Sequence, residues 1–309
     1  MSLVPEMDHR IPTPGRPEPL PSADALVAPF SAGRGRCEVE VPAGACDCHV
    51  HVYDASYPAV PGARLTPPDA SVADYRRLQR RTGTQRVVFV TPSTYGSDNR
   101  PMLEALATFG DAARGVAVVD ASIDAATLRR LHDAGVRGVR LNLSLGLTNS
   151  AEQMAPLAAR IADLGWHLQL LMPPAQLATL GPALRALPVP VVFDHFGRIS
   201  PSMAGHAAHR LVLELLAEGR AWMKLSGGYI VTEQGPPGYG DIAPLARSYL
   251  AVAPHRMLWG SDWPHASASA GHQPLPDDAR QMALLADWAE TPASLQRVLV
   301  DNPAELYGF

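Results

Sequence analysis

Several features typical of other protein classes are absent from this chain of 309 residues. It has no run of eighteen or more apolar residues, so no membrane-spanning helix is expected. The N-terminus lacks a basic patch followed by an apolar stretch and so does not resemble a secretion signal. The formal net charge of -4 gives no electrostatic reason to expect a nucleic-acid partner. Three cysteines are too few for a disulfide scaffold, and the default location is the reducing cytoplasm.

A glycine-rich phosphate loop is also missing. No Gly-x-Gly-x-x-Gly turn follows the first apolar run, which argues against a nucleotide cofactor and against the doubly wound sheet that binds one. The chain does contain 47% hydrophobic residues, which is enough for a sizeable core, and only 18% charged residues.

Residues 1–42 differ from the rest of the chain because they are rich in proline and show little periodicity. Such a segment cannot sustain a helix or a central strand. We expect a leader that is disordered at its start and becomes an extended arm over the surface towards residue 42. The prolines of this leader are Pro5, Pro12, Pro14, Pro17, Pro19, Pro21, Pro29 and Pro42.

From residue 43 onwards, short apolar runs alternate with segments of helical spacing. The runs are continuous rather than alternating, as buried parallel strands are. Eight strands over roughly 260 residues match the usual size of a (β/α)₈ barrel, so we predict an α/β fold with a single TIM-barrel domain over residues 43–309. The predicted strands are 45–52, 86–91, 115–120, 136–143, 167–172, 189–195, 221–226 and 257–262.

Helix signals lie between these runs. Ser71 is placed to cap a helix over 72–81 that ends before Gly83. Ser150 and Gln153 form a capping-box pattern. Pro292 stands at the first position of a helix over 293–300.

The motif Asp47-x-His49-x-His51 at the end of the first strand carries the clearest functional signal. Alternation along a strand predicts that its three polar side chains share one face. Two imidazoles and a carboxylate suit metal coordination or polarisation of a carbonyl. In a parallel barrel, all C-terminal strand ends meet at one mouth. The other predicted strand ends add Ser93, Tyr95, Arg140, Asn142, Gln169, Asp194, His195, Lys224, Ser226 and Asp262.

Each of these residues alone also has a structural explanation. Arg140 could form an ion pair, Lys224 could pair with a nearby carboxylate, and Asp262 could cap a helix or a turn. Their convergence on one mouth is what favours a functional site.

Four motifs together resemble the amidohydrolase superfamily, of the amidohydrolase-2 type. They are Asp47-x-His49-x-His51, Asp194-His195-Phe196-Gly197, Trp259-Gly260-Ser261-Asp262-Trp263-Pro264-His265 and Asn302-Pro303-Ala304. The segments 92–99 and 138–142 are similar to the branch of lactone hydrolases related to 2-pyrone-4,6-dicarboxylate lactonase. The resemblance covers nearly all of the chain after the leader.

The resemblance implies a barrel that hydrolyses a small carboxylated lactone, such as a pyrone carboxylate, a muconolactone-type compound or a sugar-acid lactone. It assigns Asp262 as the carboxylate that activates water and places His49, His51 and His195 around the scissile carbonyl. Arg140 corresponds to a position that binds a substrate carboxylate. Ser93, Tyr95, Asn142 and Gln169 are the further candidates for substrate binding.

The chain departs from the metal-dependent members at two strands. Gln169 stands where a histidine ligand is expected, and Arg140 stands where many members have lysine. The remaining ligand candidates are His49, His51 and Asp262, with His195 as a fourth. We therefore expect a site that needs no metal, with one divalent metal, most plausibly zinc, as the alternative. The stretch 144–148 lacks a basic residue, which favours a substrate with a single carboxylate instead of two, or a sugar-acid lactone.

Three other functions stay open at this point. The same mouth could serve a zinc-dependent amidohydrolase or decarboxylase, a lactone isomerase, or a non-catalytic barrel that only binds. The expected partner is a small anionic lactone, with no nucleic acid and no membrane. Barrels often assemble as dimers, and the sequence leaves a homo-oligomer open.

Overall fold

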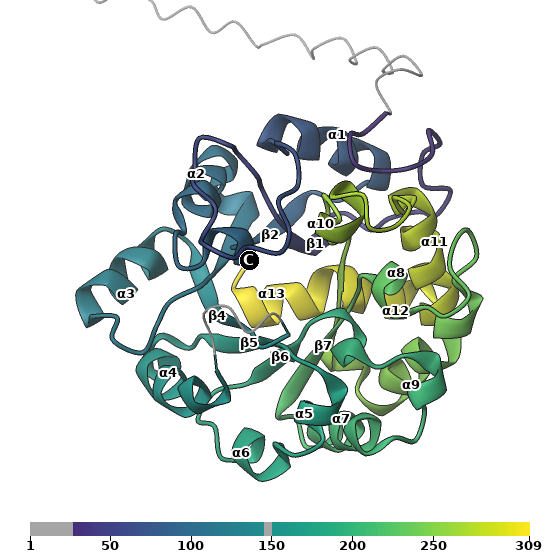
Figure 1. Cartoon of the computed structure of the whole chain (residues 1–309). Helices are drawn as coiled ribbons and strands as arrows, with labels where there is room; N and C mark the ends of the chain where they lie inside the picture. The colour runs from purple at the N-terminus through teal and green to yellow at the C-terminus, as the bar shows by residue number, and fades with distance from the viewer. Residues whose placement is uncertain (1–26, 145–149) are drawn as a thin grey trace, which may run out of the picture.

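The structure is a computed structural model that describes residues 27–144 and 150–309. Eight strands form one sheet, and each strand pairs in parallel with the next along the chain (Figure 1). The predicted (β/α)₈ barrel is therefore confirmed. The strands are β1 (Cys46–Val50), β2 (Arg86–Val90), β3 (Ala113–Ala117), β4 (Val136–Asn142), β5 (His167–Leu171), β6 (Val191–Phe193), β7 (Ala221–Ser226) and β8 (Met257–Gly260).

The barrel closes between its first and last strands. The backbone N–H of His51 donates to the carbonyl of Trp263 at 2.8 Å, and the N–H of Asp262 donates to the carbonyl of His49 at 2.9 Å. These two hydrogen bonds bring the first and last predicted site segments side by side, although they are more than 200 residues apart in the chain.

Helices surround the sheet (Figure 1). The main apolar core lies between these helices and the outer face of the barrel. None of the helices in the described ranges has the length and apolar character of a membrane span. The helices are α1 (Val72–Thr82), α2 (Arg100–Phe109), α3 (Ala125–Asp133), α4 (Met154–Ile161), α5 (Pro174–Leu177), α6 (Gly181–Arg185), α7 (Ala207–Ala217), α8 (Gly228–Val231), α9 (Ala243–Val252), α10 (Ala266–Ser269), α11 (Asp278–Ala289), α12 (Pro292–Gln296) and α13 (Asn302–Tyr307).

A second apolar cluster fills the inside of the barrel near the beginnings of the strands. Tyr307 of α13 packs there with Cys46, Trp222 and Leu258. Figure 1 shows α13 lying across the centre of the barrel, so this helix covers the end of the barrel that carries no predicted site residue.

The predicted helix signals are present. Ser71 accepts a hydrogen bond from the N–H of Asp74, and α1 ends at Thr82, before the capping residue Gly83, whose φ of 83° is in the left-handed region. Ser150 and Gln153 form the predicted capping box. Thr291 caps α12 with Pro292 in its first turn, and the helical path continues as a π-helical turn over Arg297–Asp301.

The observed strand ends differ from the predicted ones where a side chain or a turn replaces the hydrogen bonds between paired strands. β7 has the predicted bounds. β3 ends at Ala117 because the side chain of Asn99 bonds both backbone groups of Val118, at 2.9 Å each. β8 ends at Gly260 because Asp262 adopts a left-handed φ of 67°.

One prediction about the first strand was wrong. Asp47 does not share a face with His49, because the register with β2 shifts between Asp47 and Val50. Such a bulge inserts one extra residue and reverses the alternation of side chains beyond it. Asp47 points outward and accepts hydrogen bonds from Tyr75 of α1 and from Ser261, while His49 lies among buried groups inside the barrel.

The described part of the leader begins at residue 27 and packs on the barrel. The indole N–H of Trp263 donates to the carbonyl of Pro29 at 2.8 Å. The buried guanidinium of Arg81 donates to the carbonyls of Ala32 and Gly35. Residues 1–26 lie outside the described residues, and with them the start of the leader, where we predicted disorder.

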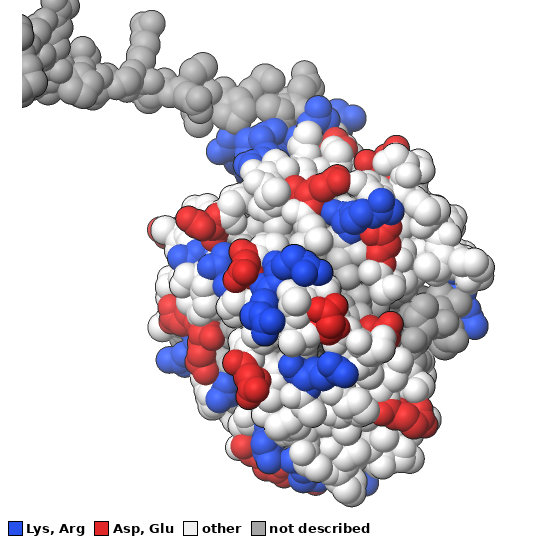
Figure 2. Space-filling view, turned by 90° about the vertical axis from the view of Figure 1, so that its left-hand side faces the viewer, with Lys and Arg blue, Asp and Glu red and all other residues white. Residues whose placement is uncertain are grey.

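Figure 2 shows acidic and basic residues interspersed on the face it presents. That face therefore has no extended field of one sign that would steer a charged macromolecule.

Candidate active site

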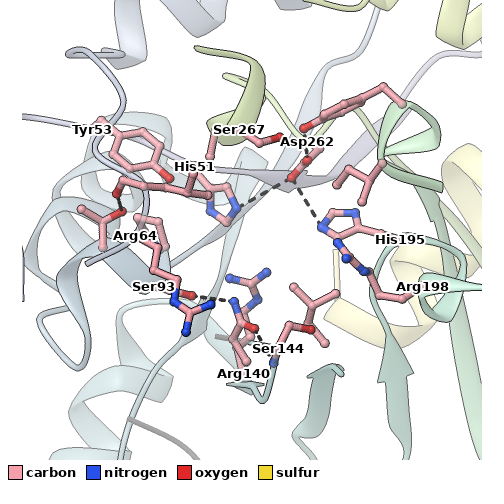
Figure 3. A pocket seen from close by; sticks show the side chains of 18 residues that line it. His51, Tyr53, Arg64, Ser93, Arg140, Ser144, His195, Arg198, Asp262 and Ser267 are labelled. Carbon is pink, nitrogen blue, oxygen red and sulfur yellow. Dashed lines mark hydrogen bonds and ion pairs between the residues drawn. The ribbon is translucent and has the colours of Figure 1, made fainter. Parts of the chain in front are cut away.

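A cavity of about 210 Å³ opens at the C-terminal ends of the strands (Figure 3). Six of the predicted site residues line it: His51, Ser93, Arg140, Asn142, His195 and Asp262. The lining residues that we had not predicted include Tyr53, Arg64, Arg198 and Tyr229.

The carboxylate of Asp262 lies at the centre of the imidazole groups. Its Oδ1 is 3.5 Å from His49 Nε2, 3.8 Å from His51 Nε2 and 3.6 Å from His195 Nε2. Its Oδ2 accepts a hydrogen bond of 2.5 Å from the hydroxyl of Tyr229. The structure thus brings the acid and all three predicted imidazoles around one point.

Burial and mutual contact set the charges of these groups. Burial alone would raise the pKa of Asp262, but His195, His49 and His51 outweigh it and lower this pKa to about 2. Burial lowers the pKa of His51 to about 4 and lowers the pKa values of His49 and His195 as well. At neutral pH the site therefore holds an ionised carboxylate among neutral imidazoles.

The hydrogen bond of His51 fixes its tautomer. Its Nδ1 lies 2.7 Å from the carbonyl of Val90, which only accepts, so Nδ1 carries the hydrogen. The Nε2 of neutral His51 consequently presents a lone pair towards the cavity.

His49 has the opposite tautomer. Its Nδ1 lies 3.2 Å from both Lys224 Nζ and Asp194 Oδ1. Since Nδ1 of His51 carries its hydrogen, the contact between the two Nε2 atoms requires a hydrogen on His49 Nε2, which leaves His49 Nδ1 as an acceptor for the amine. His49 Nδ1 therefore accepts, and its Nε2–H points towards His51 Nε2 at 3.3 Å.

A buried polar network lies beneath the cavity. Asp194 accepts hydrogen bonds from Arg140 Nε and from Gln169 Nε2, each at 3.1 Å. Lys224 donates to Gln169 Oε1 at 2.7 Å. Gln169 is fully buried and does not line the cavity, so its side chain belongs to this network and we no longer assign it to substrate binding.

The two predicted hydroxyl residues after β2 have different surroundings. Ser93 lies at the cavity and accepts a hydrogen bond of 2.7 Å from Asn142. Tyr95 lies outside the cavity lining, and its hydroxyl bonds the backbone N–H and carbonyl of Asp54. Tyr95 therefore holds the loop after β1 in place, which corrects its predicted contact with substrate.

Two groups of side chains could hold a metal ion by position alone. They are His49, His51 and Asp262, and His49, Asp194 and His195, each with ligand atoms within 4.8 Å of one another. The tautomers limit the first group, because His49 directs an N–H and not a lone pair at its centre. With this tautomer only His51 and Asp262 of that group offer a lone pair to a metal ion. Two ligands are fewer than the three protein ligands typical of a catalytic zinc.

The missed residues come from segments beyond the strand ends. Arg198 follows His195 by three residues, in a turn where His195, Phe196 and Arg198 all have positive φ. Tyr229 follows Gly227-Gly228, a turn signal visible in the sequence. Arg64 lies in the long loop before α1, where no periodicity marks a position.

We expect the free energy of unfolding to fall as pH drops from 6.5 towards 4. His51 and His167, with pKa values lowered by burial to about 4 and about 3, stay neutral in the folded chain but take up protons near pH 6.5 when unfolded. Burial raises the pKa of Asp47 to about 7, so the folded chain binds this proton at a higher pH than the unfolded chain does. The resulting gain in stability offsets the loss from one of the two histidines. These three groups together contribute a fall of about 1.4 kcal/mol per pH unit. His49 and His195, whose pKa values are also lowered, add to this fall, and His265, whose pKa is raised, opposes it. Urea unfolding at pH 7 and pH 5 measures it, and an equal or higher midpoint at pH 5 would contradict it.

Comparison with known proteins places these residues in a family context. Residues 46–309 match the family model described as amidohydrolase. This match spans all eight strands and every residue of the cavity.

Among curated relatives, a 2-pyrone-4,6-dicarboxylate hydrolase of Comamonas testosteroni is 36% identical over 289 residues, covering 89% of this chain and 94% of the relative. A 4-sulfomuconolactone hydrolase of Rhizobium radiobacter is 31% identical, covering 94% and 99%. A D-galactarolactone isomerase of Agrobacterium fabrum is 33% identical, covering 86% and 91%. A ligand-free crystal structure from Agrobacterium tumefaciens is 30% identical with a TM-score of 0.78, covering 87% and 97%.

Proposed function

This chain belongs to the amidohydrolase family, and we propose that it opens the ring of a small anionic lactone by hydrolysis. One observation carries the proposal: the ionised carboxylate of Asp262 faces a cavity that three guanidinium groups also line. Three relatives are named for lactones, two of them as hydrolases.

Asp262 is the proposed general base. A water molecule that donates a hydrogen to Asp262 Oδ1 would lie beside His51 Nε2, which is 3.8 Å from that oxygen. As the water oxygen bonds to the lactone carbonyl carbon, its proton passes to Asp262. The low pKa of Asp262 keeps it ionised at neutral pH, and the N–H of His49 Nε2 faces the lone pair of His51 Nε2 at 3.3 Å.

His195 is the proposed donor to the carbonyl oxygen. Its Nδ1 lies 2.9 Å from Ser226 Oγ, and a hydrogen bond donated by that hydroxyl leaves Nε2–H facing the cavity. This N–H would stabilise the negative charge that develops on the carbonyl oxygen. When the carbon–oxygen bond of the ring breaks, the ring oxygen takes the proton back from Asp262. The product carries one hydroxyl and one new carboxylic acid.

We propose that these steps need no metal. The support is the tautomer of His49, whose acceptor nitrogen is taken by Lys224, and the commitment of Gln169 to Asp194 and Lys224. A divalent ion would act as a Lewis acid on the same carbonyl, but binding it at His49 would require breaking the hydrogen bond from Lys224.

The arginines indicate the charge of the substrate. Arg140 is buried, with its Nε on Asp194, and Arg198 and Arg64 line the cavity from two other segments. Guanidinium groups grip carboxylates with two parallel hydrogen bonds. We therefore propose a substrate with two anionic groups, which replaces the single carboxylate inferred from the sequence. Of the segment behind that inference, residues 145–148 lie outside the described residues.

A panel of lactones tests the function. The full-length protein should release acid from lactones with two carboxylates in a pH-stat assay, faster than from lactones with one, and equally well before and after treatment with a chelator. Neutral lactones should be poor substrates. Loss of turnover after chelation, restored by zinc, would contradict the metal-free site. Conversion without acid release, followed by NMR, would identify an isomerase, in which a hydroxyl of the substrate attacks in place of water.

A further inference from the structure

The segment after β7 contacts both the acid and one imidazole of the cavity. Ser226 Oγ lies 2.9 Å from His195 Nδ1, and the hydroxyl of Tyr229 donates to Asp262 Oδ2 at 2.5 Å. Glycines at 227 and 228 allow this approach. A Cβ at Gly227, where φ is 59°, would lie 2.7 Å from His195 Nδ1, and one at Gly228 would lie 2.8 Å from Ile242 Cδ1.

The backbone of Asp262 is fixed by its fold position, whereas its carboxylate is held at only one oxygen among the described residues. The N–H of Asp262 bonds the carbonyl of His49, and its φ of 67° fixes the direction of the side chain. The three imidazole nitrogens stand 3.5–3.8 Å from Oδ1, beyond the usual length of a hydrogen bond. Among the described residues, Tyr229 provides the only hydrogen bond to this carboxylate.

The ring of Tyr229 packs against a buried histidine. Its ring meets the ring of His265 edge to face, with centroids 5.3 Å apart and planes at 89°. His265 Nε2 pairs with Asp278 Oδ2 at 3.1 Å, and both side chains are fully buried. The phenol therefore has little freedom to leave Asp262.

We propose that Tyr229 is a positioning residue, whose hydroxyl holds Oδ2 of Asp262 so that Oδ1 faces the water and the lactone carbonyl. The inference rests on the proposed hydrolysis. Without this hydroxyl the carboxylate rotates away from the reacting atoms. A misplacement of about 1 Å can lower a rate by about 10²-fold, so the effect belongs to kcat and not to substrate binding.

The test begins with Tyr229→Phe, which keeps the ring against His265 and removes only the hydroxyl. We expect kcat to fall by about 10²-fold with KM nearly unchanged. Tyr249→Phe is the matched control, since it removes a buried phenol hydroxyl that bonds the carbonyl of Phe196 outside the cavity, and it should leave kcat unchanged. Wild-type kcat in Tyr229→Phe would overturn the inference.

Chemical rescue separates the hydroxyl from packing. In Tyr229→Ala, added p-cresol should restore turnover and toluene should not. Equal rescue by toluene would show that Tyr229 only fills space, and would overturn the proposal. A crystal structure of Tyr229→Phe gives a measurement independent of turnover, in which we expect the Asp262 carboxylate to be rotated. If the Asp262 carboxylate is not rotated in this structure, the inference about Tyr229 is wrong, whatever the lactone panel shows. If only the lactone panel fails, the proposed function is wrong.

Discussion

Replacing Asp262 by asparagine is expected to lower kcat by about 10²–10⁴-fold, because an amide cannot take the proton from water. The fold should survive. The amide oxygen can still accept the hydrogen bond from Tyr229, and the backbone bond to His49 is unaffected. The measurement is turnover of the best lactone from the panel, with the unfolding midpoint recorded in parallel.

Ser267→Ala is a suitable control for that variant, because Ser267 lies on the rim of the same cavity and has no role in the proposed steps. It should retain turnover within a few-fold. An asparagine variant with near wild-type kcat would remove Asp262 from the role of base. In that case His51, the other acceptor at the cavity, would be the group to test next.

Replacing Asp194 by asparagine is expected to destabilise the fold by about 3–5 kcal/mol, since it leaves buried cations without their counter-charge. Burial alone would raise the pKa of Asp194, but His49, Lys224 and Arg140 lower it well below its usual range. The carboxylate is therefore ionised in the folded chain, beside Lys224, which has no exposed surface. Denaturant unfolding measures the loss.

Two further variants check the cause of that loss. Adding Lys224→Met to Asp194→Asn should recover part of the stability, because it removes one of the unpaired charges. Glu218→Gln breaks an ion pair with Arg185 on the surface and should have no measurable effect. An unchanged midpoint in Asp194→Asn would mean that Asp194 does not act as the counter-ion.

The barrel could be predicted from the sequence because its signals are local. Continuous apolar runs, caps such as Ser71 and the Pro at position 292 act within a few residues of where they stand. The convergence of His49, His195 and Asp262 also followed, because parallel strands all end at one mouth.

Features set by tertiary contacts could not be predicted in this way. The bulge in β1 follows from how Asp47 bonds Ser261 across the closing strands, and a periodicity of two gives no sign of it. Arg64 reaches the cavity from a loop whose path depends on Tyr95. Tyr229 came closest to being predicted, because it stands only three residues after Ser226, the last residue of the seventh predicted strand.

Barrel closure has a consequence for how this protein loses activity. Asp262 and His49 sit on opposite sides of the junction between β8 and β1 and are joined there by one backbone hydrogen bond. Loss of the hydrogen bonds between β8 and β1 would separate the carboxylate of Asp262 from the imidazole of His49 while the other seven strand pairings stay intact. Inactivation on heating should therefore precede the loss of secondary structure, which makes turnover an earlier reporter of damage than circular dichroism.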